Sequence, residues 1–148
     1  MEQILTSKLH AFLVDNNPDL LITLQSTSAV TNYLEEKVSS ILPEAILMLA
    51  EETPVHEIMD HCMMELTADL RPSKYHLISR LLASDFQKAY TLMRETGTLT
   101  YEIINILRVC WDVFEETPLT AENEDDRTLH YALLGCIQDY LWNTSEQR

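Results

Sequence analysis

The chain has 148 residues, of which 46% are hydrophobic and 23% charged, a balance that is typical of one globular domain and excludes wholesale disorder. Its net charge is −14, from 24 acidic and 10 basic residues, so sequence-independent binding to nucleic acid or to an anionic membrane surface is disfavoured. Only two glycines occur, which leaves little material for hairpins or glycine-rich phosphate loops and favours helices with short connections.

The N-terminal half carries four amphipathic helical patterns, at residues 2–15, 19–25, 28–49 and 54–69. Asn17 and Pro18 are typical of a helix cap and a first helical position, and Thr53 and Pro54 repeat this signal. Pro43 lies within the third pattern, whose unbroken apolar spacing favours one kinked helix over two helices. The third pattern has these apolar residues at helical spacing: Val30, Tyr33, Leu34, Val38, Ile41, Ala45 and Leu49. In the fourth pattern we expect the following positions to be buried: Val55, Ile58, Met59, Cys62, Met63 and Leu66.

Pro72 marks a boundary near the middle of the chain, because proline cannot continue a preceding helix but suits the first turn of a new one. Beyond it, one apolar stripe recurs at helical spacing: Tyr75, Ile78, Leu82, Phe86, Ala89 and Met93. Leu77, Leu81 and Tyr90 add apolar surface away from that stripe. We therefore predict a central helix near residues 72–95, which ends at Gly97 because glycine adopts the left-handed conformation easily.

Two further helices are predicted after Gly97. Thr98 or Thr100 caps the first, whose apolar positions are Ile103, Ile104, Leu107, Cys110, Trp111 and Phe114. The second begins between Thr120 and Asp125 and ends at about Trp142, and we expect residues 143–148 to fray.

The segment Glu115-Glu116-Thr117-Pro118 repeats the Glu-Glu-Thr-Pro of residues 51–54. We interpret the repeat as the same junction chemistry used twice and not as a duplication, because the flanking sequences do not match. Four of the five prolines stand at predicted helix starts, and no strand-like alternation competes with the helices. The sequence thus predicts an all-α fold, an irregular bundle of six or seven helices around the central helix, in a single domain over residues 1–148.

The segment 56–61 invites comparison with a zinc signature, but His56 and His61 are five residues apart and do not share a helix face. Glu57, His61 and Glu65 lie four apart in turn and do share one. They could hold a metal if another helix supplied a fourth ligand. A solvated helix face with Glu–His pairs explains the same spacing and is preferred.

An acidic run precedes Arg127 and consists of Glu122, Glu124, Asp125 and Asp126, with Glu115 and Glu116 upstream. Acidic residues at a helix start are stabilised by the helix dipole, so the run needs no ligand to explain it. A calcium loop would require spaced oxygen ligands and an internal glycine, which are absent from the run.

Half of the basic residues fall in the predicted central helix or directly before it: Arg71, Lys74, Arg80, Lys88 and Arg94. One interpretation is a docking face for an acidic partner, with Arg71, Lys74, Arg80 and Lys88 as partner-binding residues. The other is internal, since these charges spread over about half of the helix circumference and can offset the acidic helices beside them.

Three cysteines, Cys62, Cys110 and Cys136, are widely spaced among apolar helical neighbours, which favours reduced, buried thiols over a disulfide or a metal site. The N-terminus lacks the basic leader of a signal peptide, and no apolar run is long enough to span a bilayer. We therefore expect a cytoplasmic protein.

Three parts of the chain resemble a known family: Leu70-Arg71-Pro72-Ser73-Lys74-Tyr75 with Phe86, then Gly97-Thr98-Leu99-Thr100-Tyr101, then Glu122-Asn123-Glu124-Asp125-Asp126-Arg127 with Tyr131. The family is an uncharacterised all-helical bacterial domain of unknown function, known mainly from anaerobic gut and oral bacteria. The resemblance implies an all-α fold in the bacterial cytoplasm, and it carries over no catalytic residues because the family has none assigned.

The sequence contains no nucleophile elbow, Walker loop or dinucleotide fingerprint, and no cofactor is expected. We therefore predict a non-enzymatic protein–protein interaction or adaptor module that binds another protein or itself, with no direct contact to nucleic acid or membrane. One alternative is an acidic DNA mimic that regulates a nucleic-acid-binding protein. A second is a metal-dependent enzyme that uses Glu57, His61 and Glu65.

Overall fold

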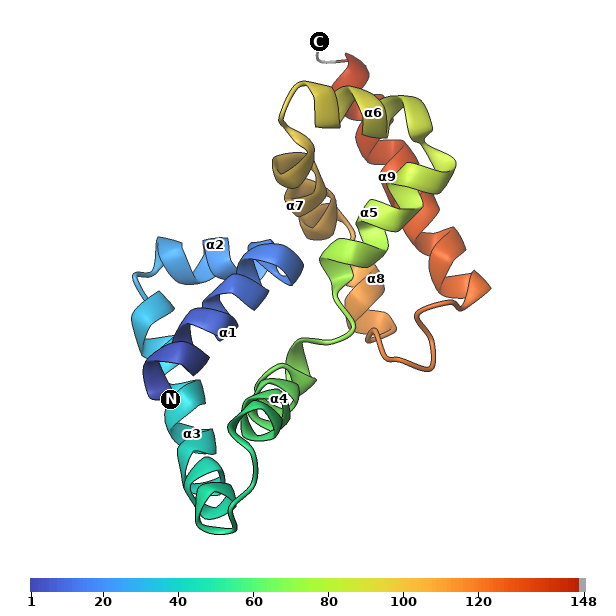
Figure 1. Cartoon of the computed structure of the whole chain (residues 1–148). Helices are drawn as coiled ribbons and strands as arrows, with labels where there is room; N and C mark the ends of the chain where they lie inside the picture. The colour runs from blue at the N-terminus through green and yellow to red at the C-terminus, as the bar shows by residue number, and fades with distance from the viewer. Residues whose placement is uncertain (147–148) are drawn as a thin grey trace. The chain divides into compact units, whose positions relative to one another are not determined.

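The computed structural model describes residues 1–146, and every regular element within that range is helical (Figure 1). The first part of the chain forms α1 (Glu2–Asn16), α2 (Pro18–Ser26), α3 (Val30–Ala50), α4 (Val55–Leu66) and a 3₁₀ turn, η1 (Ala68–Leu70). The second part forms α5 (Lys74–Asp85), α6 (Gln87–Glu95), α7 (Leu99–Val109), α8 (Trp111–Glu116) and α9 (Arg127–Glu146). The all-α prediction is confirmed, although the described residues form nine α-helices where six or seven were predicted.

The helices make two compact units, Met1–Arg71 and Pro72–Arg148, each with its own apolar core. The boundary predicted from Pro72 is thus also the boundary between the units. Arg71 is extended, with φ −111° and ψ 144°, because the proline that follows disfavours helical backbone at this position. The prediction of a single domain over residues 1–148 stays a prediction.

The core of the first unit is organised around α1. Leu5, Leu9 and Leu13 follow one another at intervals of four residues, which places them on one helix face, and all three are fully buried. Each contributes about 1.5–3 kcal/mol to folding through the apolar surface it removes from water. They pack in one cluster with buried residues of α3 and α4: Leu34, Val38, Ile41, Ala45, Ile58, Met59, Cys62 and Leu66.

α3 runs through Pro43 as one helix of 21 residues, so the prediction of one helix in place of two is confirmed. Pro43 has no amide proton and leaves a carbonyl one turn earlier without its helical partner. Ile41 and Ala45 on either side are buried in the core. Their packing holds the helix together across the proline.

The predicted central helix near residues 72–95 is two helices, α5 and α6, which meet at Phe86. Phe86 has φ −134° and ψ 52°, well outside the helical range, and this single residue redirects the chain. Hydrogen bonding continues across it, because its amide donates to the Leu82 carbonyl and its carbonyl accepts from Tyr90, each at 2.9 Å. The apolar spacing therefore passes through the joint without a gap.

The last part of the chain differs from the prediction in three further places. The helix predicted after Gly97 is interrupted at Cys110, which separates α7 from α8. The final helix begins at Arg127 and not between residues 120 and 125. Asp126 caps the helix at this point, because its Oδ2 accepts a hydrogen bond from the Leu129 amide at 3.0 Å. The helix also continues to Glu146, so residues 143–146 are helical where fraying was expected, and residues 147–148 lie outside the described part.

In the second unit α5 packs against α6, α7 and α9, and α8 packs against α7 and α9. The core of this unit consists of Leu77, Ile78, Leu81, Leu82, Ile103, Ile106, Leu107, Cys110, Phe114, Leu129, Leu133 and Ile137. Gly97 ends α6 with φ 75°, as predicted from its freedom at positive φ. Leu82 is fully buried and Phe86 packs against the core, so the stripe predicted from the sequence does face inward.

Candidate functional site

The end of the first unit where α3 turns into α4 exposes four large aliphatic side chains. Ile46, Leu47 and Leu49, in the last turns of α3, are 62%, 59% and 45% exposed. Val55, the first residue of α4, is 58% exposed. Single exposed aliphatic residues are ordinary, but four within ten residues at one helix–helix turn make this turn a candidate for a surface that meets a partner. We call Ile46, Leu47, Leu49 and Val55 the apolar tip.

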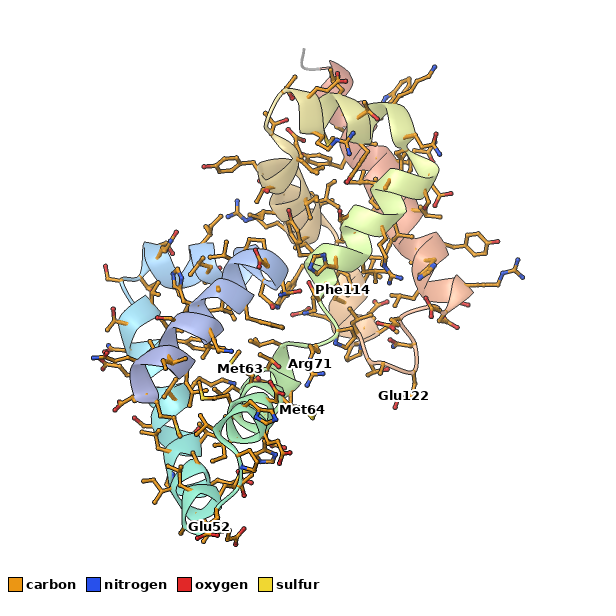
Figure 2. All side chains as sticks on the ribbon, viewed as in Figure 1. Glu52, Met63, Met64, Arg71, Phe114 and Glu122 are labelled. Atoms are coloured by element: carbon orange, nitrogen blue, oxygen red, sulfur yellow. The ribbon has the colours of Figure 1, made fainter. Side chains whose placement is uncertain are left out.

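The turn that carries the apolar tip is set by backbone hydrogen bonds. Glu52 adopts φ 61°, its amide donates to the Leu49 carbonyl, and the Thr53 amide donates to the Met48 carbonyl, both at 3.0 Å. These two bonds form a Schellman motif, which ends α3 and reverses the chain. Figure 2 shows Glu52 at this turn, with its side chain directed outward.

Two sequence predictions are wrong at this turn. Pro54, not Thr53, occupies the cap position of α4, and no side chain caps the helix. Val55 was expected to be buried but is exposed, as is Leu49 at the end of the preceding apolar pattern. The signal was present in the sequence, because residues 45–50 are consecutively apolar and one helix face cannot bury them all.

The sequence around the apolar tip contains acidic residues and no lysine or arginine. Residues 38–70 contain no lysine or arginine but seven acidic residues: Glu44, Glu51, Glu52, Glu57, Asp60, Glu65 and Asp69. Glu51, Glu52 and Glu57 are exposed close to the tip in the sequence. Lys37, just before this stretch, is paired with Asp69 at 2.8 Å. The surface of this end of the unit therefore combines exposed aliphatic side chains with the exposed carboxylates of Glu51, Glu52 and Glu57.

The candidate metal ligands Glu57, His61 and Glu65 are not brought together as a site. His61 Nε2 lies 2.8 Å from Glu44 Oε1 and so ties α4 to α3, while Glu57 and Glu65 are exposed. Among residues 1–146 no three His, Cys, Asp or Glu side chains are grouped so that they could hold a metal ion. Burial, together with the neighbouring Glu44 carboxylate, raises the pKa of the Cys62 thiol.

The four predicted partner-binding basic residues have separate local surroundings. Arg71, the last residue of the first unit, donates a hydrogen bond from Nη2 to the Met64 carbonyl at 3.0 Å (Figure 2). In the second unit, Lys74 Nζ lies 5.1 Å and 5.4 Å from the ring centroids of Trp111 and Phe114. Arg80 lies 3.9 Å from Asp125, and Lys88 belongs to the first turn of α6. A role for these residues in partner binding stays a prediction.

The acidic run before α9 is partly engaged in local structure. Asp126 caps α9, Asp125 lies near Arg80, and the Glu124 carbonyl lies 2.6 Å from His130 Nε2. This use of the run at a helix start agrees with the interpretation that needs no ligand.

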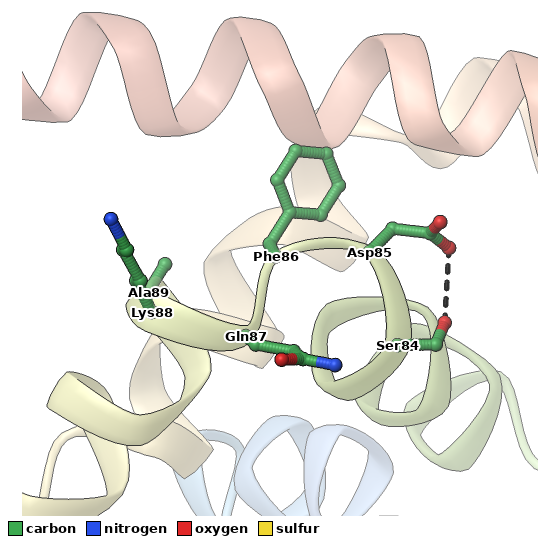
Figure 3. Close-up of a pocket in the computed structure, with 6 residues that line it drawn as sticks. All are labelled: Ser84, Asp85, Phe86, Gln87, Lys88 and Ala89. Carbon is green, nitrogen blue, oxygen red and sulfur yellow. Dashed lines mark hydrogen bonds between the residues drawn. The ribbon is translucent and has the colours of Figure 1, made fainter.

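An open pocket of about 430 Å³ lies at the α5–α6 joint, and Figure 3 shows its lining residues: Ser84, Asp85, Phe86, Gln87, Lys88 and Ala89. All six are consecutive in the chain, and Ser84 Oγ donates to Asp85 Oδ2 at 3.0 Å. A catalytic site generally draws reactive groups from several elements toward one point, and this pocket draws its lining from one joint.

No protein-family model matches the chain, and comparisons with curated proteins and with solved structures also found no match. None of the described helices is both long and apolar enough to cross a membrane.

Proposed function

We propose that the protein is a non-enzymatic protein–protein interaction module and that it docks its partner through the apolar tip. The observation that supports this most directly is the exposure of Ile46, Leu47, Leu49 and Val55 at one helix–helix turn. Apolar side chains held in water at a defined turn gain free energy when a partner covers them.

The apolar tip alone supports only weak binding. Burying such a side chain completely contributes about 1.5–3 kcal/mol, and these four are already about half buried, so each offers about 1 kcal/mol. Four of them give about 4 kcal/mol, which corresponds to a dissociation constant of about 1 mM even before the entropic cost of association. A useful affinity therefore requires a second contribution from the same surface.

A paired-variant capture experiment tests the docking surface. The tagged full-length chain and its Leu47→Ser/Val55→Ser variant would be incubated with a lysate of the organism that makes the protein. The Ile4→Ser/Val14→Ser variant is a matched control, because Ile4 and Val14 are also exposed aliphatic residues of the first unit. We expect the wild type and the control to retain a protein that the tip variant loses.

Light scattering on the same variants measures their mass and so tests whether the protein associates with itself. A mass above that of the 17.1 kDa chain that falls only in the tip variant would identify a second copy as the partner. Identical binding and identical mass for all three proteins would contradict the proposal.

The two alternatives weighed from the sequence lack a comparable supporting observation in the described residues. Glu57, His61 and Glu65 do not gather, and the acids near residue 125 are partly used to cap and pair within the second unit.

A further inference from the structure

The joint between α1 and α2 has the same backbone conformation as the joint between α5 and α6. Asn17 has φ −136° and ψ 53°, and Phe86, which is 69 residues later, has φ −134° and ψ 52°. In both joints the amide donates to the carbonyl four residues earlier, on Leu13 and Leu82 respectively, at 2.9 Å. A nine-residue helix follows in each unit, α2 in the first and α6 in the second.

The next turn also recurs at the same spacing. Ser28 and Gly97, again 69 residues apart, hold positive φ values of 56° and 75°. The hydrogen bonds that close the two turns are equivalent, from Ala29 to Leu24 at 2.8 Å and from Thr98 to Met93 at 2.9 Å. α3 and α7 then begin at equivalent positions, Val30 and Leu99.

The buried positions follow the same register. Six pairs of residues separated by 69 are buried in both units: Leu9 and Ile78, Leu13 and Leu82, Leu34 and Ile103, Val38 and Leu107, Ile41 and Cys110, Ala45 and Phe114. The two units are therefore built alike over this range, with α7 and α8 together equivalent to α3. α9 packs against α5 and α7 as α4 packs against α1 and α3, although its buried positions do not keep the 69-residue register. The Glu-Glu-Thr-Pro segments are 64 residues apart and do not follow this register, in agreement with the interpretation that they mark no repeat.

Because of this register, residues of the first unit can be compared with the residues 69 positions later in the second unit. Ile46 and Leu47 follow the buried Ala45, and the equivalent residues after the buried Phe114 are Glu115 and Glu116, also helical and exposed. The shared arrangement of helices thus accepts glutamate at both positions. Exposed isoleucine and leucine there are not required by the fold and are particular to the first unit.

We propose that the apolar tip binds an amphipathic helix whose apolar face is flanked by lysine or arginine. This rests on the proposed function and adds the chemistry of the partner. The choice follows from charge, because Glu51, Glu52 and Glu57 are exposed close to the tip in the sequence and residues 38–70 contain no lysine or arginine. A cationic helix would contribute to the binding free energy in two ways. Its apolar face covers the tip, and its basic residues attract the acidic residues close to the tip.

The test uses the full-length chain and synthetic peptides of about 18 residues, five helical turns, with leucine at helical spacing. One peptide carries lysine at its polar positions and the other carries glutamate. Binding is measured by calorimetry for the wild type, for Ile46→Glu/Leu47→Glu and for Ile4→Glu/Val14→Glu. The two variants add the same negative charge to the first unit, and only the first of them changes the apolar tip, where it replaces two of the four aliphatic residues.

We expect the lysine peptide to bind the wild type and the Ile4/Val14 variant with the same affinity, and the Ile46/Leu47 variant at least about tenfold more weakly. Its affinity for the wild type should fall as salt is added. The glutamate peptide should not bind. Equal or tighter binding of the lysine peptide to the Ile46/Leu47 variant would overturn the proposal, since attraction to the acidic chain as a whole would then explain binding. Circular dichroism of the variants confirms that the helices are retained, and Leu47→Ser is a milder second variant.

The outcome separates this proposal from the general one. If the lysine peptide fails to bind the wild type while the lysate partner is still lost on Leu47→Ser/Val55→Ser, the docking surface stands and the cationic helix is rejected. If neither ligand responds to changes at the tip, both proposals fail.

Discussion

Individual backbone angles decide how the helices of this protein end. Ser28, Glu52 and Gly97 hold positive φ among the described residues, and only Gly97 does so without a side chain. For an L-residue this conformation costs about 1 kcal/mol relative to glycine. We expect Ser28→Gly and Glu52→Gly to raise the free energy of unfolding by about 1 kcal/mol each, and Gly97→Ala to lower it by a similar amount, in urea titrations followed by circular dichroism.

Gly135 provides the matched comparison for these substitutions. It lies within α9, it has ordinary helical geometry, and a Cβ added to it would meet no atom within 4 Å. Gly135→Ala should therefore stabilise the protein by about 0.5–1 kcal/mol. Stabilisation by Gly97→Ala as well would show that the backbone at residue 97 is not left-handed in solution.

Cys110 makes the stability of the protein sensitive to alkaline pH. Burial, with Cys136 beside it, raises the pKa of Cys110 from 9.0 to about 12. Between these values the unfolded thiol has lost its proton and the folded thiol has kept it, so the unfolded state binds fewer protons. The free energy of unfolding should therefore fall as pH rises from about 9 towards 12, by up to about 1.4 kcal/mol per pH unit.

Urea titrations across this pH range, on the wild type and on Cys110→Val, measure the contribution of this thiol. The variant should show a shallower pH dependence. Some slope should remain, because burial also raises the pKa of Tyr33 and of Tyr140, which act in the same direction. An identical slope in both proteins would exclude Cys110 as its source.

At the scale of the helix, only some of the helices that have a serine, threonine or aspartate near their first residue are capped by its side chain. Ser73 Oγ accepts the His76 amide at 3.1 Å at the start of α5, and Asp126 Oδ2 accepts the Leu129 amide at 3.0 Å at the start of α9. Ser73→Ala and Asp126→Ala should each lower the free energy of unfolding by about 1 kcal/mol. Thr53→Ala is the control and should change it by less than about 0.5 kcal/mol, because the Thr53 side chain caps no helix.

At the scale of the whole molecule, the separate cores predict separate responses to damage. Leu9 and Ile78 are equivalent residues of the two units and both are fully buried. Replacing either by alanine leaves a cavity and should cost about 2–5 kcal/mol. We expect Leu9→Ala to lower hydrogen-exchange protection mainly in residues 1–71 and Ile78→Ala mainly in residues 72–146. Equal loss of protection throughout the chain after either substitution would show that the two units unfold as one.

Much of this architecture was predictable from individual residues. Pro18, Pro72 and Gly97 act through their own covalent geometry, which restricts or frees φ wherever they stand, and each marks the boundary that its chemistry implies. The joints at Phe86 and Cys110 were not predictable in this way. A change in the backbone angles of one residue leaves the spacing of the apolar residues intact, so an argument from periodicity does not detect it.

The candidate site was harder to predict than the helices. Leu49 and Val55 have the spacing of core residues, and their exposure depends on how far α3 extends beyond the cluster that covers Ala45. Likewise, Glu57, His61 and Glu65 share a helix face, but the partner of His61 is Glu44 on another helix. Spacing along one helix does not tell which neighbouring helix lies opposite.

The sequence by itself determined that the chain is helical, where most helices begin and end, and that residues 38–70 are acidic without a basic residue, because these properties depend on local geometry and on composition. Only the tertiary structure decided that the helices form two units of the same design and that four aliphatic residues remain in water at the α3–α4 turn. Both depend on which helices pack together, and such packing is fixed by contacts between residues far apart in the sequence.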